Sequence, residues 1–282
     1  MEKVLLPMRA LLVILASATA VVAQTDAREI IRRAAAAEDR NWKVARNYTF
    51  SEREKLRYLD SQGRVRSQEV SIHDVTLLDG SPYSRLVARD DRPLPSAEER
   101  KEQEKLTRST AERRDQTAAQ RTQRLSEYVL RPEWQREAWR ELPNAFDFRL
   151  AGEEVWEGHT LFVIEATPHP GYQALSRTAK VFAHLRCKLS VDKQDYHLVK
   201  GQVEVVETIS VGLFLVRVAK GSHAAFEQTR VNDEVWLPSQ VHAFVSARLG
   251  LLKVLRFEQE LTYSKCHESQ PDSPIVAQMS AK

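Results

Sequence analysis

The chain has 282 residues, of which 42% are hydrophobic, and it carries 42 Lys and Arg against 39 Asp and Glu. This near balance of charge excludes a general nucleic-acid binder, because contacts to many phosphates require a basic excess. The length and the hydrophobic content predict one large globular domain or two small ones.

The first 23 residues are typical of an export signal. Lys3 and Arg9 precede an apolar run from Leu11 to Val22, and small residues up to Ala23 fit a signal peptidase site. A run of about 12 apolar residues is short of the ~20 that a membrane span needs. No cysteine lies near the cleavage point, so a lipid anchor is not expected there. We therefore expect an exported, periplasmic protein that is cleaved near Ala23.

A helix and a three-stranded meander are predicted next. Residues Thr25–Trp42 carry an apolar stripe at helical spacing, and Asp26 followed by Glu29 resembles a capping box. Between Tyr48 and Ala88 apolar and polar residues alternate, and turn residues at 60–63 and 79–80 divide the segment into three strands.

A highly charged helical stretch interrupts the strands. Ser96-Ala97-Glu98-Glu99 fits a capping box that opens one helix reaching to about Ser126. A shorter helix from Arg131-Pro132 has apolar residues at every fourth position, so we expect it to pack on the sheet. Together these helices form an insertion over about residues 96–140.

The rest of the chain is predicted as strands followed by a disordered tail, residues 267–282, rich in Ser, Pro and Gln. The order of about ten strands and three helices predicts an α+β fold with a single large antiparallel sheet, in one domain of residues 24–266. The later strand ranges are Phe146–Val155, Leu161–Thr167, Lys188–Asp192, His197–Thr208, Leu213–Ala219, His223–Val231, Val235–Ser246 and Leu251–Ser264.

No catalytic or metal motif stands out. The sequence has no Gly-x-Ser-x-Gly elbow and no glycine-rich phosphate loop, and its eight histidines lack metal-ligand spacing. Gly221-Ser222-His223 places a serine beside a histidine, but neighbours in a strand point to opposite faces, which favours a turn over a nucleophile and base. We expect no catalytic residue, no metal and no cofactor, while a glycosidase carboxylate pair stays open.

Cys187 and Cys266 are the only two cysteines. In an oxidising compartment they would form a disulfide that closes a loop of about 80 residues and contributes at most about 4 kcal/mol. The alternative is two unpaired thiols, because the sequence does not show whether the two positions meet. Both readings stay open, and the disulfide is the one we predict.

One face of the predicted sheet is apolar and short of helical cover. Apolar and charged residues alternate in 255–263 and 162–166, and segment 209–216 is apolar almost throughout. That segment fits a buried central strand as well as a wall that contacts acyl chains. Because the predicted helices are few and charged, we expect a hydrophobic groove. The predicted lining residues are Tyr48, Phe50, Phe162, Ile164, Phe214, Val216, Leu255 and Phe257.

Four loose sheet motifs lie in the second half of the chain: Glu141–Phe148, Ile164–Pro168, Leu189–Asp192 and Gln228–Pro238. With them, the chain resembles the LolA/LolB lipoprotein-sorting superfamily of bacterial envelopes. The resemblance implies an unclosed β-barrel, that is, an incomplete antiparallel sheet curved around helices, with a cavity for acyl chains. The charged insertion departs from that pattern, and no functional residue is transferred by motif.

The preferred hypothesis is a periplasmic, non-enzymatic carrier or binder of lipid or lipoprotein acyl chains, without a cofactor. The first alternative is an envelope sensor or protein-interaction module that uses the charged helices of 96–126 to contact an envelope protein. The arginines of that segment also allow transient contact with a membrane surface. An envelope hydrolase is the third hypothesis, and no nucleic-acid partner is expected.

Overall fold

Thirteen strands, in two series along the chain, are found in the computed structural model, which describes residues 26–129, 133–177, 179–211, 216–250 and 253–269. The first series is β1 (Tyr48–Leu59), β2 (Val65–Leu78), β3 (Ser81–Arg89) and β4 (Arg92–Pro93). The second is β5 (Phe146–Trp156), β6 (His159–Pro168), β7 (Leu185–Asp192), β8 (Leu198–Val205), β9 (Ile209–Val211), β10 (Val216–Val218), β11 (His223–Val231), β12 (Val235–Leu249) and β13 (Lys253–Glu268).

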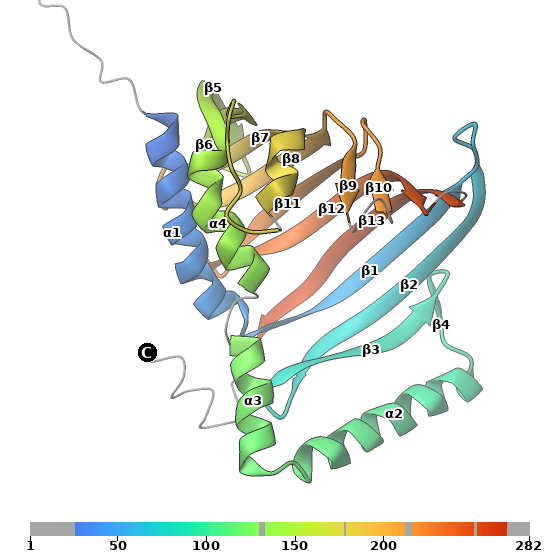
Figure 1. Cartoon of the computed structure of the whole chain (residues 1–282). Coiled ribbons are helices and arrows are strands. Elements are labelled where there is room, and N and C mark those ends of the chain that lie inside the picture. The colour runs from blue at the N-terminus through green and yellow to red at the C-terminus, as the bar shows by residue number, and fades with distance from the viewer. Residues whose placement is uncertain (1–25, 130–132, 178, 212–215, 251–252, 270–282) are drawn as a thin grey trace, which may run out of the picture.

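All these strands join one antiparallel sheet in the order β4-β3-β2-β1-β13-β12-β11-β8-β7-β6-β5, with β10 pairing with β12 and β9 with β10 (Figure 1). The two series meet where β13 pairs with β1, from Tyr48 opposite Glu268 to Tyr58 opposite Phe257. In the described part of the chain β4 and β5 stay unjoined edges, so the sheet is not closed. The predicted α+β fold with an unclosed antiparallel sheet is confirmed.

Four α-helices and one short 3-10 helix accompany the sheet in the described residues: α1 (Ala27–Ala45), α2 (Ser96–Arg114), α3 (Ala118–Val129), α4 (Glu133–Ala145) and η1 (Ala179–His184). Helices α1 and α4 lie over the end of the sheet that contains β5 to β8, whereas α2 and α3 lie along β3 (Figure 1). We call the side of the sheet that faces α1, α2 and α4 the inner face, and the opposite side the outer face.

The largest core cluster lies under α1. The side chain of Asp26 accepts a hydrogen bond from the backbone N–H of Arg28 at 2.9 Å and caps the helix. Ile30 and Ile31, each 1% exposed, then pack against Phe162 and Ile164 of β6. The period of the helix and the alternation of the strand thus bring two apolar faces together.

The charged helical stretch differs from its prediction. It is two helices, because α2 ends at Arg114 and α3 starts at Ala118. Thr117 and Gln120 form a capping box: the N–H of Gln120 donates to the Thr117 hydroxyl at 3.3 Å, and the N–H of Thr117 donates to the Gln120 side chain at 3.0 Å. The capping box predicted at Ser96 is wrong, since Pro95 is the N-cap and makes no side-chain cap.

Several predicted segments lie partly or wholly outside the described residues. The export signal (1–23), Leu213–Leu215 of one predicted strand and most of the tail are among them. The remainder of that strand is β10, and β13 continues to Glu268, two residues into the predicted tail. No described helix is long and apolar enough to span a membrane.

Candidate functional site

A cavity of about 300 Å³ lies between α4 and the inner face of the sheet, and we call it the α4 cavity. Its wall is almost entirely apolar. The lining side chains include Ala138, Trp139 and Leu142 of α4, Phe182 of η1, and Leu185, Cys187, Leu189, Leu198, Phe226 and Val241 of the sheet. A cavity lined in this way offers few partners to water and favours an apolar ligand.

A close approach between two strands shapes one wall of this cavity. Gly201 of β8 lies directly opposite Phe226 of β11. The Phe226 ring occupies the position that the Cβ atom of any other residue at 201 would take. Both residues line the cavity. The absence of a side chain at position 201 therefore holds the Phe226 ring against the sheet and keeps the space above it open.

Helix α4, which lines the cavity, is fastened to the loop before η1 by a buried carboxylate. Glu141 is 5% exposed and accepts hydrogen bonds from the N–H groups of Leu175 (2.8 Å) and Ser176 (3.1 Å) and from the Tyr172 hydroxyl. Burial alone would raise the pKa of Glu141, but these hydrogen bonds outweigh it and lower the pKa. Glu141 is therefore an ionised anchor for the element that covers the cavity.

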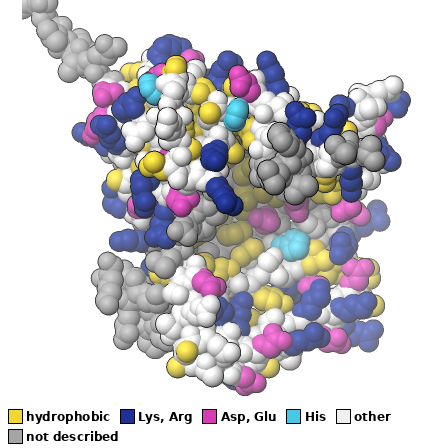
Figure 2. Space-filling model, in the orientation of Figure 1, with side chains coloured by type: hydrophobic (Ala, Val, Ile, Leu, Met, Phe, Trp, Pro, Cys, Tyr) yellow, Lys and Arg dark blue, Asp and Glu magenta, His cyan; other side chains and the backbone are white. Residues whose placement is uncertain are grey.

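Beyond the α4 cavity the inner face continues as an uncovered apolar stretch. Val241 of β12, which lines the cavity, lies opposite Leu261 of β13, and Phe257 lies on the same face of β13. Side chains here are only half-buried, and in the described residues no helix packs extensively on β13. Figure 2 shows hydrophobic side chains in the hollow between the upper helices and α2.

The predicted lining residues fall into two groups. Tyr48, Phe162 and Ile164 lie in core clusters, and the Tyr48 hydroxyl also accepts a hydrogen bond from Asn232 at 3.2 Å. Phe50, Val216, Leu255 and Phe257 are half-buried, and Phe50 makes an edge-to-face contact with Tyr263 at 5.4 Å between ring centroids. Phe214 lies outside the described residues. None of the seven described residues lines the α4 cavity.

The disulfide predicted between Cys187 and Cys266 is not formed, and both are free thiols. Cys187 lies on β7 in the wall of the α4 cavity, whereas Cys266 packs on β13 against the cluster of Tyr48, Val235 and Leu237. Strands β8, β11 and β12 lie between them in the sheet, which is too wide a gap for a disulfide. Burial raises the pKa of the Cys187 thiol to about 12, so it remains protonated and unreactive.

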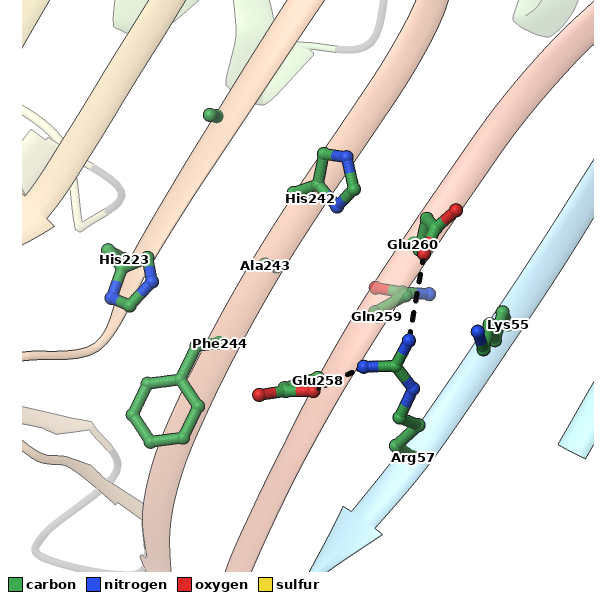
Figure 3. Close-up of a pocket in the computed structure, with 10 residues that line it drawn as sticks. Lys55, Arg57, His223, His242, Ala243, Phe244, Glu258, Gln259 and Glu260 are labelled. Atoms are coloured by element: carbon green, nitrogen blue, oxygen red, sulfur yellow. Dashed lines mark hydrogen bonds and ion pairs between the residues drawn. The ribbon is translucent and has the colours of Figure 1, made fainter. Parts of the chain in front are cut away.

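A second cavity, of about 210 Å³, lies on the outer face, and charged side chains of β1 and β13 are part of its lining (Figure 3). Arg57 of β1 reaches Glu258 at 2.9 Å and Glu260 at 4.0 Å, so these two carboxylates of β13 are paired with it. His242 and His223 line the same cavity. The described residues contain no group of three His, Cys, Asp or Glu side chains that could hold a metal ion.

The serine and histidine singled out in the sequence do not face each other. Ser222 is 2% exposed, and its hydroxyl accepts a hydrogen bond from the N–H of Ser246 at 3.1 Å. The His223 ring lies near the backbone carbonyl of Gly221 at 3.0 Å and the Phe244 ring at 5.4 Å. Ser222 therefore links the start of β11 to the backbone of Ser246 in β12.

Sequence reasoning missed most of the α4 cavity. The stripe of Ala138 and Leu142 with Trp139 correctly predicted that this helix packs on the sheet. The small residues that leave space beneath it, among them Ala166 and Gly201, carried the remaining signal. A glycine inside a strand marks a close approach of another group.

No protein-family model matches the chain, and no curated protein is similar to it in sequence. Solved structures resemble it in outline. A LolA superfamily protein from Nitrosomonas europaea is 12% identical with a TM-score of 0.32, over 88% of this chain and 94% of that one. An outer membrane lipoprotein-sorting protein domain from Vibrio parahaemolyticus is 12% identical with a TM-score of 0.37, over 91% and 100% of the two chains.

A third solved structure is MucB in complex with MucA, at 12% identity and a TM-score of 0.24, over 87% of this chain and 100% of that one. A member of the superfamily named from the sequence motifs is thus among the solved structures that this chain resembles in outline. At these identities and TM-scores the function of a neighbour does not transfer.

Proposed function

We propose that this protein is a periplasmic, non-enzymatic carrier or binder of lipid or lipoprotein acyl chains. The observation that carries the proposal is the α4 cavity, whose apolar lining continues along the inner face of β12 and β13 to Leu261 and Phe257. An acyl chain has the chemistry that such a surface selects, because it is long, flexible and without polar groups.

The energy of binding would come from burial. Each Å² of apolar surface removed from water contributes about 25 cal/mol, from which the costs of association are subtracted. No proton transfer is required, and the only thiol that lines the α4 cavity remains protonated. Binding would therefore be reversible and governed by how well the chain fits the space under α4.

Filling the α4 cavity tests the proposal. Ala138→Phe places a ring in it from α4, and Ala111→Phe makes the same change on the exposed surface of α2 as a control. We expect the first variant to lower the affinity for a fluorescent fatty acid at least about tenfold, and the second to leave it unchanged. Mass spectrometry of gently purified protein should also detect a bound lipid. Equal affinity in both variants would contradict the proposal.

A protein-contact role for α2 is the second candidate. Only one residue of this helix, Glu102, is buried, so α2 adds little to the core. It is held instead by Arg113, which donates to the carbonyl of Ser81 at 3.0 Å and to that of Leu78, the two strand residues that flank the β2–β3 turn. A variant that lacks residues 96–114 should still bind the fluorescent fatty acid if the first proposal holds. If the same variant no longer binds an envelope protein that the full chain binds, the second candidate is supported.

A further inference from the structure

Three arginines lie together on the outer face at one end of the sheet, and we call them the arginine pocket. Arg217 of β10 is directly opposite Arg248 of β12, and Arg256 of β13 lies on the same face. They line a cavity of about 310 Å³ together with Thr208, Ser246 and Val254. Among the described residues, no carboxylate lines this cavity.

The positive charge of this pocket is not neutralised within the described part of the chain. Neither Arg217 nor Arg248 forms an ion pair there, although like charges directly opposite each other in a sheet are destabilising. Arg256 donates to the backbone carbonyl of Ser61 at 2.6 Å, in the turn between β1 and β2, and so keeps its charge without a carboxylate partner. A bound anion would remove this repulsion.

The chemistry of the pocket selects phosphate. Guanidinium groups donate paired hydrogen bonds that match the oxygens of a phosphate, and the hydroxyls of Thr208 and Ser246 supply further donors. Three such groups around one cavity suit a phosphate group better than a single carboxylate.

The surroundings of the pocket are those of a membrane-binding surface. Val254 in its wall and Val65 at the start of β2 are each 54% exposed, and Lys253 is also exposed. Exposed apolar residues among cations are typical of proteins that bind anionic bilayers.

We propose that this end of the sheet docks on a membrane surface, with the phosphate of an anionic phospholipid headgroup bound in the arginine pocket. The inference goes beyond the proposed function, since it names where the protein would meet a bilayer. It stands apart from the α4 cavity, because the pocket is on the opposite face.

The test is co-sedimentation of the full chain with vesicles of phosphatidylcholine, with and without phosphatidylglycerol. The double variant Arg217→Gln/Arg248→Gln removes two charges from exposed positions, and Arg100→Gln/Arg114→Gln removes two exposed charges from α2 as a control. Each charge in contact with an anionic surface contributes about fivefold to binding, so we expect the first variant to lose about 25-fold and the control to lose little.

Three outcomes would overturn the inference. Equal losses in both double variants would mean that net charge alone attracts the protein to the vesicles, and absence of binding to either kind of vesicle would remove the membrane altogether. Binding of inorganic phosphate in equilibrium dialysis, without binding to vesicles, would make the ligand a soluble phosphate. The fluorescent fatty acid should bind the arginine variant normally, which separates failure here from failure of the proposed function.

Discussion

The two ends of the one sheet differ in what covers their inner face. From β5 to β8, α1 and α4 lie over the strands, and residues such as Ile164 and Phe146 are fully buried. On β13 the same alternation of apolar and polar residues continues, but Leu255 and Phe257 are only half-buried. Alternation thus decides which face is apolar, while the helices decide whether that face becomes core or binding surface.

The largest effect on stability should come from replacing a phenylalanine by alanine at the covered end of the sheet, in comparison with the same change at the uncovered end. Phe146→Ala should lower the free energy of unfolding by about 4 kcal/mol, because it empties a fully buried site between α4 and η1. Phe257→Ala should cost only about 1 kcal/mol, since its ring is already half in contact with solvent. Urea unfolding of both variants measures the difference. Equal losses would mean that the uncovered stretch is core.

The next effect concerns Glu141, which fastens helix α4 over the α4 cavity. Glu141→Gln should lower the free energy of unfolding by about 2 kcal/mol at neutral pH, because a buried carboxylate that accepts three hydrogen bonds is replaced by an amide. The pKa of Glu141 is lowered in the folded protein, so its stabilisation is present above the pKa of the unfolded chain and is lost as pH falls through the folded pKa.

Unfolding experiments at neutral and at acid pH check this prediction. The difference between wild type and Glu141→Gln should therefore shrink below about pH 4, near the ordinary pKa of a glutamate. Glu104→Gln, at an exposed position on α2, is the control and should change stability little at either pH. A gap that persists unchanged in acid would show that the carboxylate charge plays no part.

Much of the fold could be predicted from the sequence because its signals are local. The alternation in β6 and β13 and the apolar stripe of α1 predicted elements that the structure confirms. The sequence also contains the Thr117–Gln120 capping box, which marks the start of α3. Because this signal was overlooked, α2 and α3 were predicted as one helix.

The candidate site was harder to predict, because whether a helix packs over a given strand depends on contacts between residues far apart in the sequence. Ile164 and Leu255 have the same alternating neighbours, yet α1 covers only the first. The space under α4 depends on which small side chains happen to lie opposite the helix, such as Ala166 and Gly201. The pairing of Cys187 with Cys266 failed for the same reason, since strand order in the sheet separates them.

A smaller effect on stability should follow from changing the wall of the α4 cavity. Gly201→Ala sets a methyl group against the Phe226 ring and must push the ring into the cavity. We expect a loss of about 1–2 kcal/mol in the free energy of unfolding and weaker binding of the fluorescent fatty acid. The double variant Gly201→Ala/Phe226→Leu makes room for the methyl group and should recover both. Weak binding that persists in the double variant would indicate that the cavity is not the site.

The smallest effect on stability should accompany a clear effect on binding. Leu255→Ser makes the uncovered part of the inner face more polar, and it should change the free energy of unfolding by less than about 1 kcal/mol because Leu255 is half-exposed. If acyl chains extend from the α4 cavity along β13, affinity for a long-chain fatty acid should fall more than affinity for a short-chain one, which ends inside the cavity. Titrating both chain lengths against this variant and wild type measures the contrast. Unchanged affinity for both lengths would confine the ligand to the α4 cavity, and a large loss of stability would place Leu255 in the core.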